Sequence, residues 1–261
     1  MWLRVSALLC RYLFLYRRSY VRTAEVFFWP VMNLVLWGFV TVYLQRLVLP
    51  EAVVFFLGGM IFWDVLYRAQ IAITLSLAEE IWVKNLLNLF LSPISMFELL
   101  LATCLMGVIR AVVNVIVLGS VAYLLYAFNM LSLGLALVPF LASLLLFGWA
   151  LGMVTMALMI RFGQAAETLA WGVPFLIEPF SAIFYPVDVL PGWLQVIARL
   201  LPATYVFEGM RTALRTGTVD GTDLAMACGL NLVYLGLGGA FFGWMLQQAR
   251  EKGYLTRLGM Q

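Results

Sequence analysis

Long uncharged stretches separated by short charged segments are the main pattern of this chain. Val26–Gln45 holds 20 residues without a charge, and 50 uncharged residues lie between Arg110 and Arg161. A helix that crosses a bilayer needs about 20 consecutive, mostly apolar residues. The first stretch therefore predicts one membrane span. The second predicts two spans, divided at the polar segment Asn129–Ser132.

The whole pattern predicts six membrane spans. Ser95 and Glu98 form a capping-box motif that marks the start of the third span. Gly163 is expected to end the fourth span as a left-handed cap, and Thr222 with Asp223 can cap the last one. We therefore expect an all-α polytopic membrane protein with one transmembrane domain over 1–261, whose spans cover about 26–45, 52–74, 97–126, 133–160, 168–185 and 224–248.

Two segments outside the spans are expected to be helical as well. Within 1–22, the side chains of Arg4, Arg11, Arg18 and Arg22 fall within about 40° of one another on a helix. This favours an amphipathic helix lying in the membrane interface; an ordinary positively charged flank is the alternative. Segment 186–222 predicts two short helices, too short to span a membrane, which we interpret as a re-entrant hairpin on the outer side.

Composition supports a membrane protein and excludes several other classes. The chain is 64% hydrophobic and 11% charged, whereas a soluble domain is about 45–50% apolar and about 25% charged. It has no histidine, and neither lysine lies in a phosphate-binding loop. The formal net charge of +3 is too small to indicate a nucleic-acid partner. We therefore expect no catalytic site, no metal and no cofactor bound by this chain.

The three cysteines, Cys10, Cys104 and Cys228, are widely separated in the sequence. They show no metal-ligand spacing and no disulfide framework, so buried free thiols are expected. Lysine and arginine set the orientation of membrane proteins, because basic flanks stay in the cytoplasm. Ten of these residues flank one side of the predicted spans and four flank the other. Both termini are therefore expected on the cytoplasmic side.

Four ionisable residues fall inside predicted spans, which makes them functional candidates. They are Asp64, Arg68, Arg110 and Glu178. Asp64 and Arg68 are four residues apart, a spacing that lets them pair on one helix. We hypothesise that Arg110 pairs across helices with Glu178 or Asp64. Such a pair would either stabilise the bundle or line a transport pathway.

Two further sequence features allow more than one interpretation. Gly148-x-x-x-Gly152 and Gly239-x-x-x-Gly243 are small-residue motifs that permit close helix packing, either within the chain or at a dimer face. Segment 79–92 is a short amphipathic stretch that contains Glu79, Glu80, Trp82 and Lys84 and ends at Ser92-Pro93. It is either a cytoplasmic lever with exposed acids for a separate motor protein, or an interfacial helix that rests on lipid.

Four stretches together resemble the membrane-spanning permease subunit of type-2 ATP-binding-cassette exporters. They are the basic N-terminal helix, the segment at 79–92, and two outer stretches. The first outer stretch is Phe184-Tyr185-Pro186-Val187-Asp188-Val189-Leu190-Pro191-Gly192-Trp193-Leu194. The second is Leu201-Pro202-Ala203-Thr204-Tyr205-Val206-Phe207-Glu208-Gly209-Met210-Arg211. The outer stretches are the most specific, because a proline-rich outer hairpin followed by a Pro…Tyr…Glu…Arg pattern is typical of this family.

The resemblance implies six spans, two permease copies, and two copies of a cytoplasmic ATPase that carry ATP and Mg. That ATPase would dock on 79–92, where Glu79, Glu80, Trp82 and Lys84 are the candidate coupling residues. The function implied is export of an amphipathic substrate, such as a lipid-linked glycan, a lipid or a drug, across a bacterial inner membrane. The residues alone also permit an ion-coupled secondary transporter that uses Glu178, Asp64 and Arg110, although such carriers usually contain internal repeats.

Overall fold

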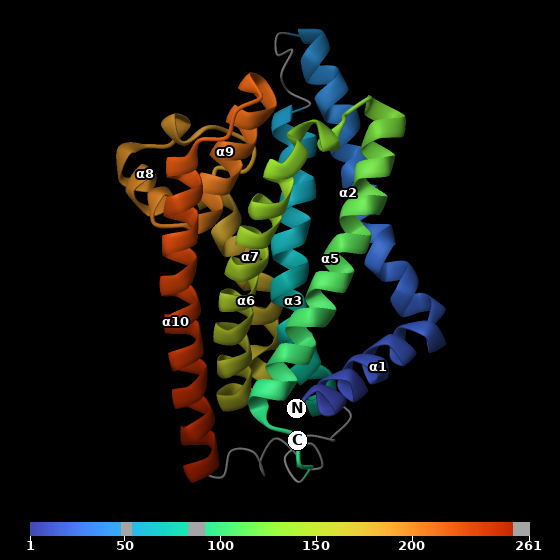
Figure 1. Cartoon of the computed structure of the whole chain (residues 1–261), viewed down its shortest axis with the longest axis vertical. Coiled ribbons are helices and arrows are strands. Elements are labelled where there is room, and N and C mark those ends of the chain that lie inside the picture. The colour runs from blue at the N-terminus through green and yellow to red at the C-terminus, as the bar shows by residue number, and fades with distance from the viewer. Residues whose placement is uncertain (48–53, 83–91, 253–261) are drawn as a thin grey trace.

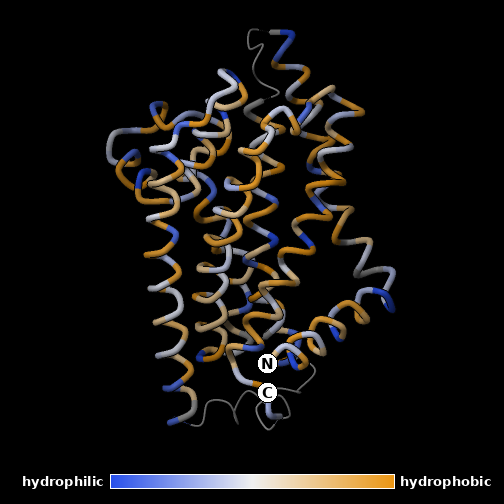
Figure 2. Tube along the Cα trace, in the orientation of Figure 1, coloured by the Kyte–Doolittle hydropathy of each residue, from blue (hydrophilic) through white to orange (hydrophobic). Residues whose placement is uncertain are grey.

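The computed structural model describes residues 1–47, 54–82 and 92–252, and every regular element in these ranges is a helix (Figure 1). Five of the described helical segments are long and apolar enough to cross a membrane. They are Val26–Arg46, Phe56–Trp82, Met96–Tyr126, Met130–Phe162 and Gly221–Ala249. The all-helical architecture expected from the sequence is therefore confirmed. Hydrophilic positions gather at the two ends of the bundle, and few lie midway (Figure 2).

The N-terminal helix α1, Trp2–Arg18, lies at an angle against the end of the bundle at which α5 begins (Figure 1). Its buried side chains are Val5, Leu8 and Tyr12, which share one face of a helix. Ser19 has an extended backbone, and α2 begins directly afterwards as Tyr20–Leu47. The N-terminal helix is thus shorter than the predicted 1–22, because the chain changes direction at Ser19.

The centre of the bundle is the pair α3, Gly59–Trp82, and α6, Leu137–Phe162. A π-helical turn, η1 (Val54–Gly58), precedes α3. A Cβ atom on Gly148 of α6 would lie 2.6 Å from the Cβ of Ala69 and from the carbonyl oxygen of Leu66 on α3. Such an approach is possible only for glycine. The intrachain interpretation of the Gly148-x-x-x-Gly152 motif is therefore confirmed.

Helix α5, Met96–Tyr126, packs beside α3 and begins with the predicted capping box. The Glu98 backbone N–H donates to the Ser95 hydroxyl, and the Ser95 N–H donates to the Glu98 carboxylate. Helix α5 is followed by the 3₁₀ helix η2, Met130–Ala136, which leads into α6. The Asn129 side chain caps η2 by accepting from the Leu131 N–H. The polar break chosen from the sequence is thus where the long apolar stretch divides.

The structure differs from the predicted caps at Gly163 and at Thr222 with Asp223. Helix α6 ends at Phe162 and Gly163 has a positive φ of 62°, but its ψ of −140° lies outside the left-handed helical region. The last helix, α10 (Gly221–Glu251), is capped by Asp220, whose carboxylate accepts from the Thr222 N–H at 2.8 Å. The predicted cap at Thr222 or Asp223 was therefore wrong, because the helix begins before those residues.

The expected fifth span over 168–185 is not one continuous helix. The chain forms the 3₁₀ turn η3 (Gly163–Ala166), helix α7 (Glu167–Ile177), and a second 3₁₀ turn, η4 (Glu178–Phe180). Pro179 has no backbone N–H to donate, and a 3₁₀ turn commonly ends an α-helix. The α-helical part is 11 residues long, well short of what an unbroken span needs.

Two short helices lie at the end of the bundle opposite α1 (Figure 1). They are α8, Gly192–Arg199, and α9, Pro202–Thr216, and the 3₁₀ turn η5, Val187–Val189, precedes them. The prediction of two short helices within 186–222 is therefore confirmed.

Candidate functional site

A cavity of about 460 Å³ lies among α2, α3 and α7. Seven of its fifteen lining residues are aromatic, and four carry an amide or charged side chain. The aromatic residues are Trp29, Trp37, Trp63, Tyr67, Trp171, Phe175 and Phe184, and the polar ones are Asn33, Asp64, Arg68 and Glu178. Apolar walls with a few convergent polar groups are typical of small-molecule binding sites.

The predicted pair of Asp64 and Arg68 is present in this cavity. The Arg68 Nε lies 3.3 Å from Asp64 Oδ1, and both side chains are largely buried. Asn114 of α5 donates to Asp64 Oδ2 at 3.1 Å, and Arg68 Nη2 donates to the Val26 carbonyl of α2 at 3.1 Å. The ion pair on α3 thus holds the two helices on either side of it.

The pair lies well inside the apolar part of its span. Asp64 is eight residues after Phe56, where the span begins, which is about 12 Å at about 1.5 Å per residue. A single charge at such depth costs at least ~2.5 kcal/mol. Pairing and hydrogen bonding offset that cost, so Asp64 and Arg68 are stable only together.

Glu178 lines the same cavity. It follows the last residue of α7 and begins η4, and its side chain is half-buried. Among the residues that the structure describes, no group donates a hydrogen bond to its carboxylate and no cation pairs with it. The cavity therefore contains one compensated carboxylate and one uncompensated carboxylate.

Arg110 lies apart from these three residues. Its guanidinium stands 4.5 Å above the ring of Tyr16 from α1, and it lines a small separate pocket with Tyr12 and Glu79. The hypothesis that Arg110 pairs with Glu178 or Asp64 was therefore wrong. Asp64 takes its cation from its own helix, while Arg110 points toward the end of the bundle covered by α1.

Comparison with known families decides what kind of membrane protein this is. The family model for the ABC-2 type transporter matches residues 5–214. The chain belongs to the ABC-2 type transporter family. A comparison with curated proteins gives no match. Together with the long apolar helices, the family assignment identifies a multi-pass permease, a transmembrane component that generally has no catalytic site of its own.

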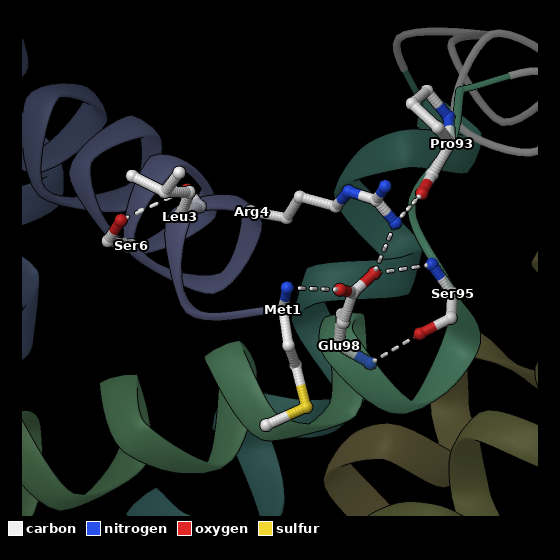
Figure 3. Close-up of polar contacts among 7 residues, drawn as sticks. All are labelled: Met1, Leu3, Arg4, Ser6, Pro93, Ser95 and Glu98. Carbon is white, nitrogen blue, oxygen red and sulfur yellow. Dashed lines mark hydrogen bonds and ion pairs between the residues drawn. The ribbon is translucent and has the colours of Figure 1, made fainter.

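Membership in the ABC-2 family implies a partnership with an ABC ATPase, and it does not favour the ion-coupled carrier. At the end of the bundle where α1 lies, polar contacts join α1 to the start of α5. There, Arg4 Nη1 lies 3.5 Å from Glu98 Oε2 and also donates to the Pro93 carbonyl (Figure 3). The Met1 amino nitrogen lies 3.7 Å from Glu98 Oε1. The N-terminal helix of the permease is thus fixed to the start of α5.

A second ion pair joins α1 to the end of α3. Arg11 Nη1 lies 2.5 Å from Glu80 Oε1. The hydrogen bond from Arg11 to Glu80 raises the pKa of the guanidinium. Glu80 is only 1% exposed. The interpretation of this segment as a lever with exposed acids does not hold for Glu80, because α1 covers it.

The four predicted coupling residues do not all lie in one element. Glu79, Glu80 and Trp82 form the last turn of α3, whereas Lys84 lies outside the described residues. Glu79 lines the small pocket with Arg110. The Trp82 indole is exposed and donates from Nε1 to Glu167 Oε2 at the start of α7, at 3.2 Å. This contact joins the ends of two helices that line the cavity.

The two outer stretches that resemble the family contact each other. Arg211 of α9 is 3% exposed and lies 2.9 Å from Glu208 Oε1. It donates to the carbonyls of Ala182 and Ile183, and Glu208 accepts from the Val187 N–H at 2.8 Å. These contacts attach the turn after η4 to α9.

The remaining outer residues also end or begin local elements. Tyr205 donates to the Arg199 carbonyl at 3.0 Å, and Tyr185 donates to the Pro179 carbonyl. Pro186 and Pro191 precede η5 and α8, and Pro202 is the first residue of α9. None of these outer residues is among those that line the cavity.

The described part of the chain contains no cluster of three or more His, Cys, Asp or Glu residues that could hold a metal ion. The three cysteines are free, but Cys10 and Cys228 are exposed and Cys104 is half-buried. The expectation of buried thiols was therefore wrong for two of them.

The aromatic cavity was not predicted from the sequence. Its tryptophans come from three separate predicted spans and share no local motif.

Proposed function

We propose that this ABC-2 permease is the membrane subunit of an ATP-driven exporter that moves an amphipathic substrate out across a bacterial inner membrane. Lipid-linked glycans, lipids and drugs are the candidate substrates. The observation that supports this most directly is the cavity at α2, α3 and α7, which lies between membrane helices and combines aromatic walls with ionisable groups. Such a lining suits a molecule with both apolar and polar parts.

In this proposal the energy comes from two copies of a cytoplasmic ABC ATPase, which bind ATP and Mg. The ATPase docks at 79–92, with Glu79, Trp82 and Lys84 as contact candidates. The ion pairs from α1 to Glu80 and Glu98 support a mechanical role for this end of the bundle. They connect α1 to the two helices that enter and leave 79–92, so a displacement there moves α3 and α5 together.

A second permease copy completes the transporter as a homodimer, with the bilayer as its environment. The substrate pathway then includes the cavity of each copy. Asp64, Arg68 and Glu178 line that pathway, whereas Arg110 serves the coupling end because it packs on α1.

Six membrane crossings fit this architecture best. Helix α6 ends at the α1 end of the bundle, and α10 begins at the opposite end, beside α9 (Figure 1). Between them, η3, α7 and η4 follow one another over 163–180, which is about 27 Å at about 1.5 Å per residue. A broken crossing of this length matches a hydrocarbon core of about 30 Å.

With six crossings, both termini lie on the cytoplasmic side, as the positive charges favour. The segment 186–222 then forms a hairpin that re-enters the outer leaflet. Its two helices are too short to cross.

The test begins with purification of the tagged chain from its native host in mild detergent. The co-purifying proteins are identified by mass spectrometry, and ATP hydrolysis is measured before and after reconstitution into vesicles. A stoichiometric partner with a phosphate-binding loop and ATPase activity is the expected result. A chain that purifies alone, without ATP hydrolysis, contradicts the proposal and supports the ion-coupled carrier.

The docking site is tested with two exposed aromatic residues at the same end of the bundle. Trp82→Ala alters the predicted coupling segment, and Phe162→Ala at the end of α6 is the matched control. We expect loss of the ATPase partner with Trp82→Ala and retention with Phe162→Ala. Equal retention in both variants would show that the partner docks elsewhere.

A further inference from the structure

We propose that the cavity at α2, α3 and α7 selects a lipophilic organic cation, with the Glu178 carboxylate as its counter-charge and the surrounding tryptophans as its walls. This inference rests on the export function proposed above and narrows its substrate class. Three features of the cavity support it: the charge balance, the aromatic surface, and the hydrogen bonds made by Arg68.

The charge balance of the cavity is negative. Asp64 and Arg68 neutralise each other through contacts of 3.3 and 3.4 Å from the guanidinium Nε to the carboxylate. Glu178 lines the same space, and the described residues offer it neither a cation nor a hydrogen-bond donor. When Glu178 is ionised, the lining therefore carries one excess negative charge. A ligand cation is the simplest group that can compensate it.

The arrangement of Arg68 disfavours an anionic ligand. Its Nε is directed to Asp64, and its Nη2 donates to the Val26 carbonyl at 3.1 Å. Asp64 already neutralises the charge of Arg68, so a phosphate or carboxylate that reached the remaining N–H groups would add a second negative charge beside that buried acid. Burial of an anion without a cation of its own is strongly unfavourable.

The C-terminal end of α7 adds further negative charge to the cavity wall. Glu178 follows the C-terminal residue of an 11-residue helix, and Phe175 from its last turn lines the cavity. The C-terminal end of a helix carries a partial negative charge from its free carbonyl groups. The helix end and the carboxylate therefore attract a cation at one wall of the cavity.

Aromatic rings supply the apolar part of the site. Trp29, Trp37, Trp63 and Trp171 are among its lining residues. The Trp37 ring is stacked on Phe184 with centroids 5.7 Å apart, so its orientation is fixed by packing. The faces of tryptophan rings attract organic cations, and aromatic cages commonly recognise quaternary ammonium groups. A cation with bulky apolar substituents satisfies both the rings and the acid.

The test uses two probes of equal shape and opposite charge, tetraphenylphosphonium and tetraphenylborate. The full chain with its co-purified ATPase is placed in lipid nanodiscs, and binding of each radiolabelled probe is measured by equilibrium dialysis. Binding to empty nanodiscs is subtracted, because both probes partition into lipid. The variants are Glu178→Gln and, as a matched control, Asp188→Asn, which removes an exposed acid outside the cavity.

We expect Glu178→Gln to weaken tetraphenylphosphonium binding about tenfold, equivalent to about 1.4 kcal/mol, without weakening tetraphenylborate. Asp188→Asn should leave both affinities unchanged. Trp37→Leu keeps the acid but removes one aromatic wall, and should weaken the phosphonium probe about threefold or more. Size-exclusion profiles identify any variant that has lost its fold, in which case Trp37→Leu decides the outcome.

Unchanged phosphonium binding in Glu178→Gln would overturn the inference, and so would an equal loss of both probes. The export function is judged separately by ATP-driven transport in vesicles. If transport depends on ATP but phosphonium binding does not depend on Glu178, the substrate class is wrong and the export function stands. If binding depends on Glu178 but no ATPase drives transport, the export function is wrong and the site stands.

Discussion

Replacing Arg68 by methionine should destabilise the permease strongly, because it leaves Asp64 ionisable and without its cation. The Asp64 side chain is 13% exposed, and the remaining partner is the Asn114 amide at 3.1 Å. Removal of one member of a buried ion pair costs about 3–5 kcal/mol. For a chain of this size, each kcal/mol shifts the unfolding midpoint by about 2–4 °C. The expected decrease in Tm is therefore about 10 °C.

The measurement is the fraction of monodisperse protein that survives heating in detergent, followed by size-exclusion chromatography. A double-mutant cycle separates the ion pair from the packing of the long side chain. Asp64→Asn combined with Arg68→Met removes both charges and keeps similar volumes, so most of the lost stability should return. If Arg68→Met is as stable as the wild type, or the double variant is no more stable than Arg68→Met, the argument about the buried pair is refuted.

Three further predictions concern other parts of the bundle. Gly148→Val should prevent α3 and α6 from packing and abolish the monodisperse protein, whereas Gly239→Val, where an added Cβ would meet no side chain and no other helix within 4 Å, should leave its Tm unchanged. Glu208→Gln should lower stability by about 3 kcal/mol, because buried Arg211 loses the carboxylate that lies 2.9 Å from its Nη2, and the Tm of this variant checks it. Hydrogen bonds from Thr222 lower the pKa of Asp220, so its cap stabilises α10 above the ordinary carboxyl range and is lost as pH falls through the lowered pKa. Asp220→Ala should therefore reduce Tm near neutral pH and flatten the decline of Tm on the acid side.

The features that sequence predicted well depend on local chemistry. The bilayer sets the length of an apolar helix, so uncharged stretches alone indicated where the long helices lie. The capping box at Ser95 and Glu98 and the i,i+4 pair of Asp64 and Arg68 each depend on neighbouring turns of one helix. The predicted cap of the last helix was wrong, because two candidate cap sites lie next to each other. Thr222 and Asp223 resemble cap residues, but Asp220 precedes them and begins the helix first.

The interruption of the fifth predicted span shows a similar limit. Its apolar composition suggested one continuous crossing, while Pro179 removed the backbone donor that an α-helix needs at that point. The result is a 3₁₀ turn that places Glu178 at the wall of the cavity. Hydropathy measures how apolar a segment is, and it carries no information about the hydrogen bonds of its backbone.

By itself, the sequence determined that this chain is an all-helical membrane protein of the ABC-2 family, because span length, helix caps and family motifs are encoded by residues close together in the chain. Only the tertiary structure decided which charges meet. Arg11 covers Glu80 across 69 positions of sequence, Arg110 stacks on Tyr16 rather than pairing with Glu178, and tryptophans from three segments enclose one cavity. These contacts arise from the angle of α1 and the packing of α2, α3 and α7. Such helix arrangements are set by the sum of many weak packing contacts, and no single stretch of residues specifies them.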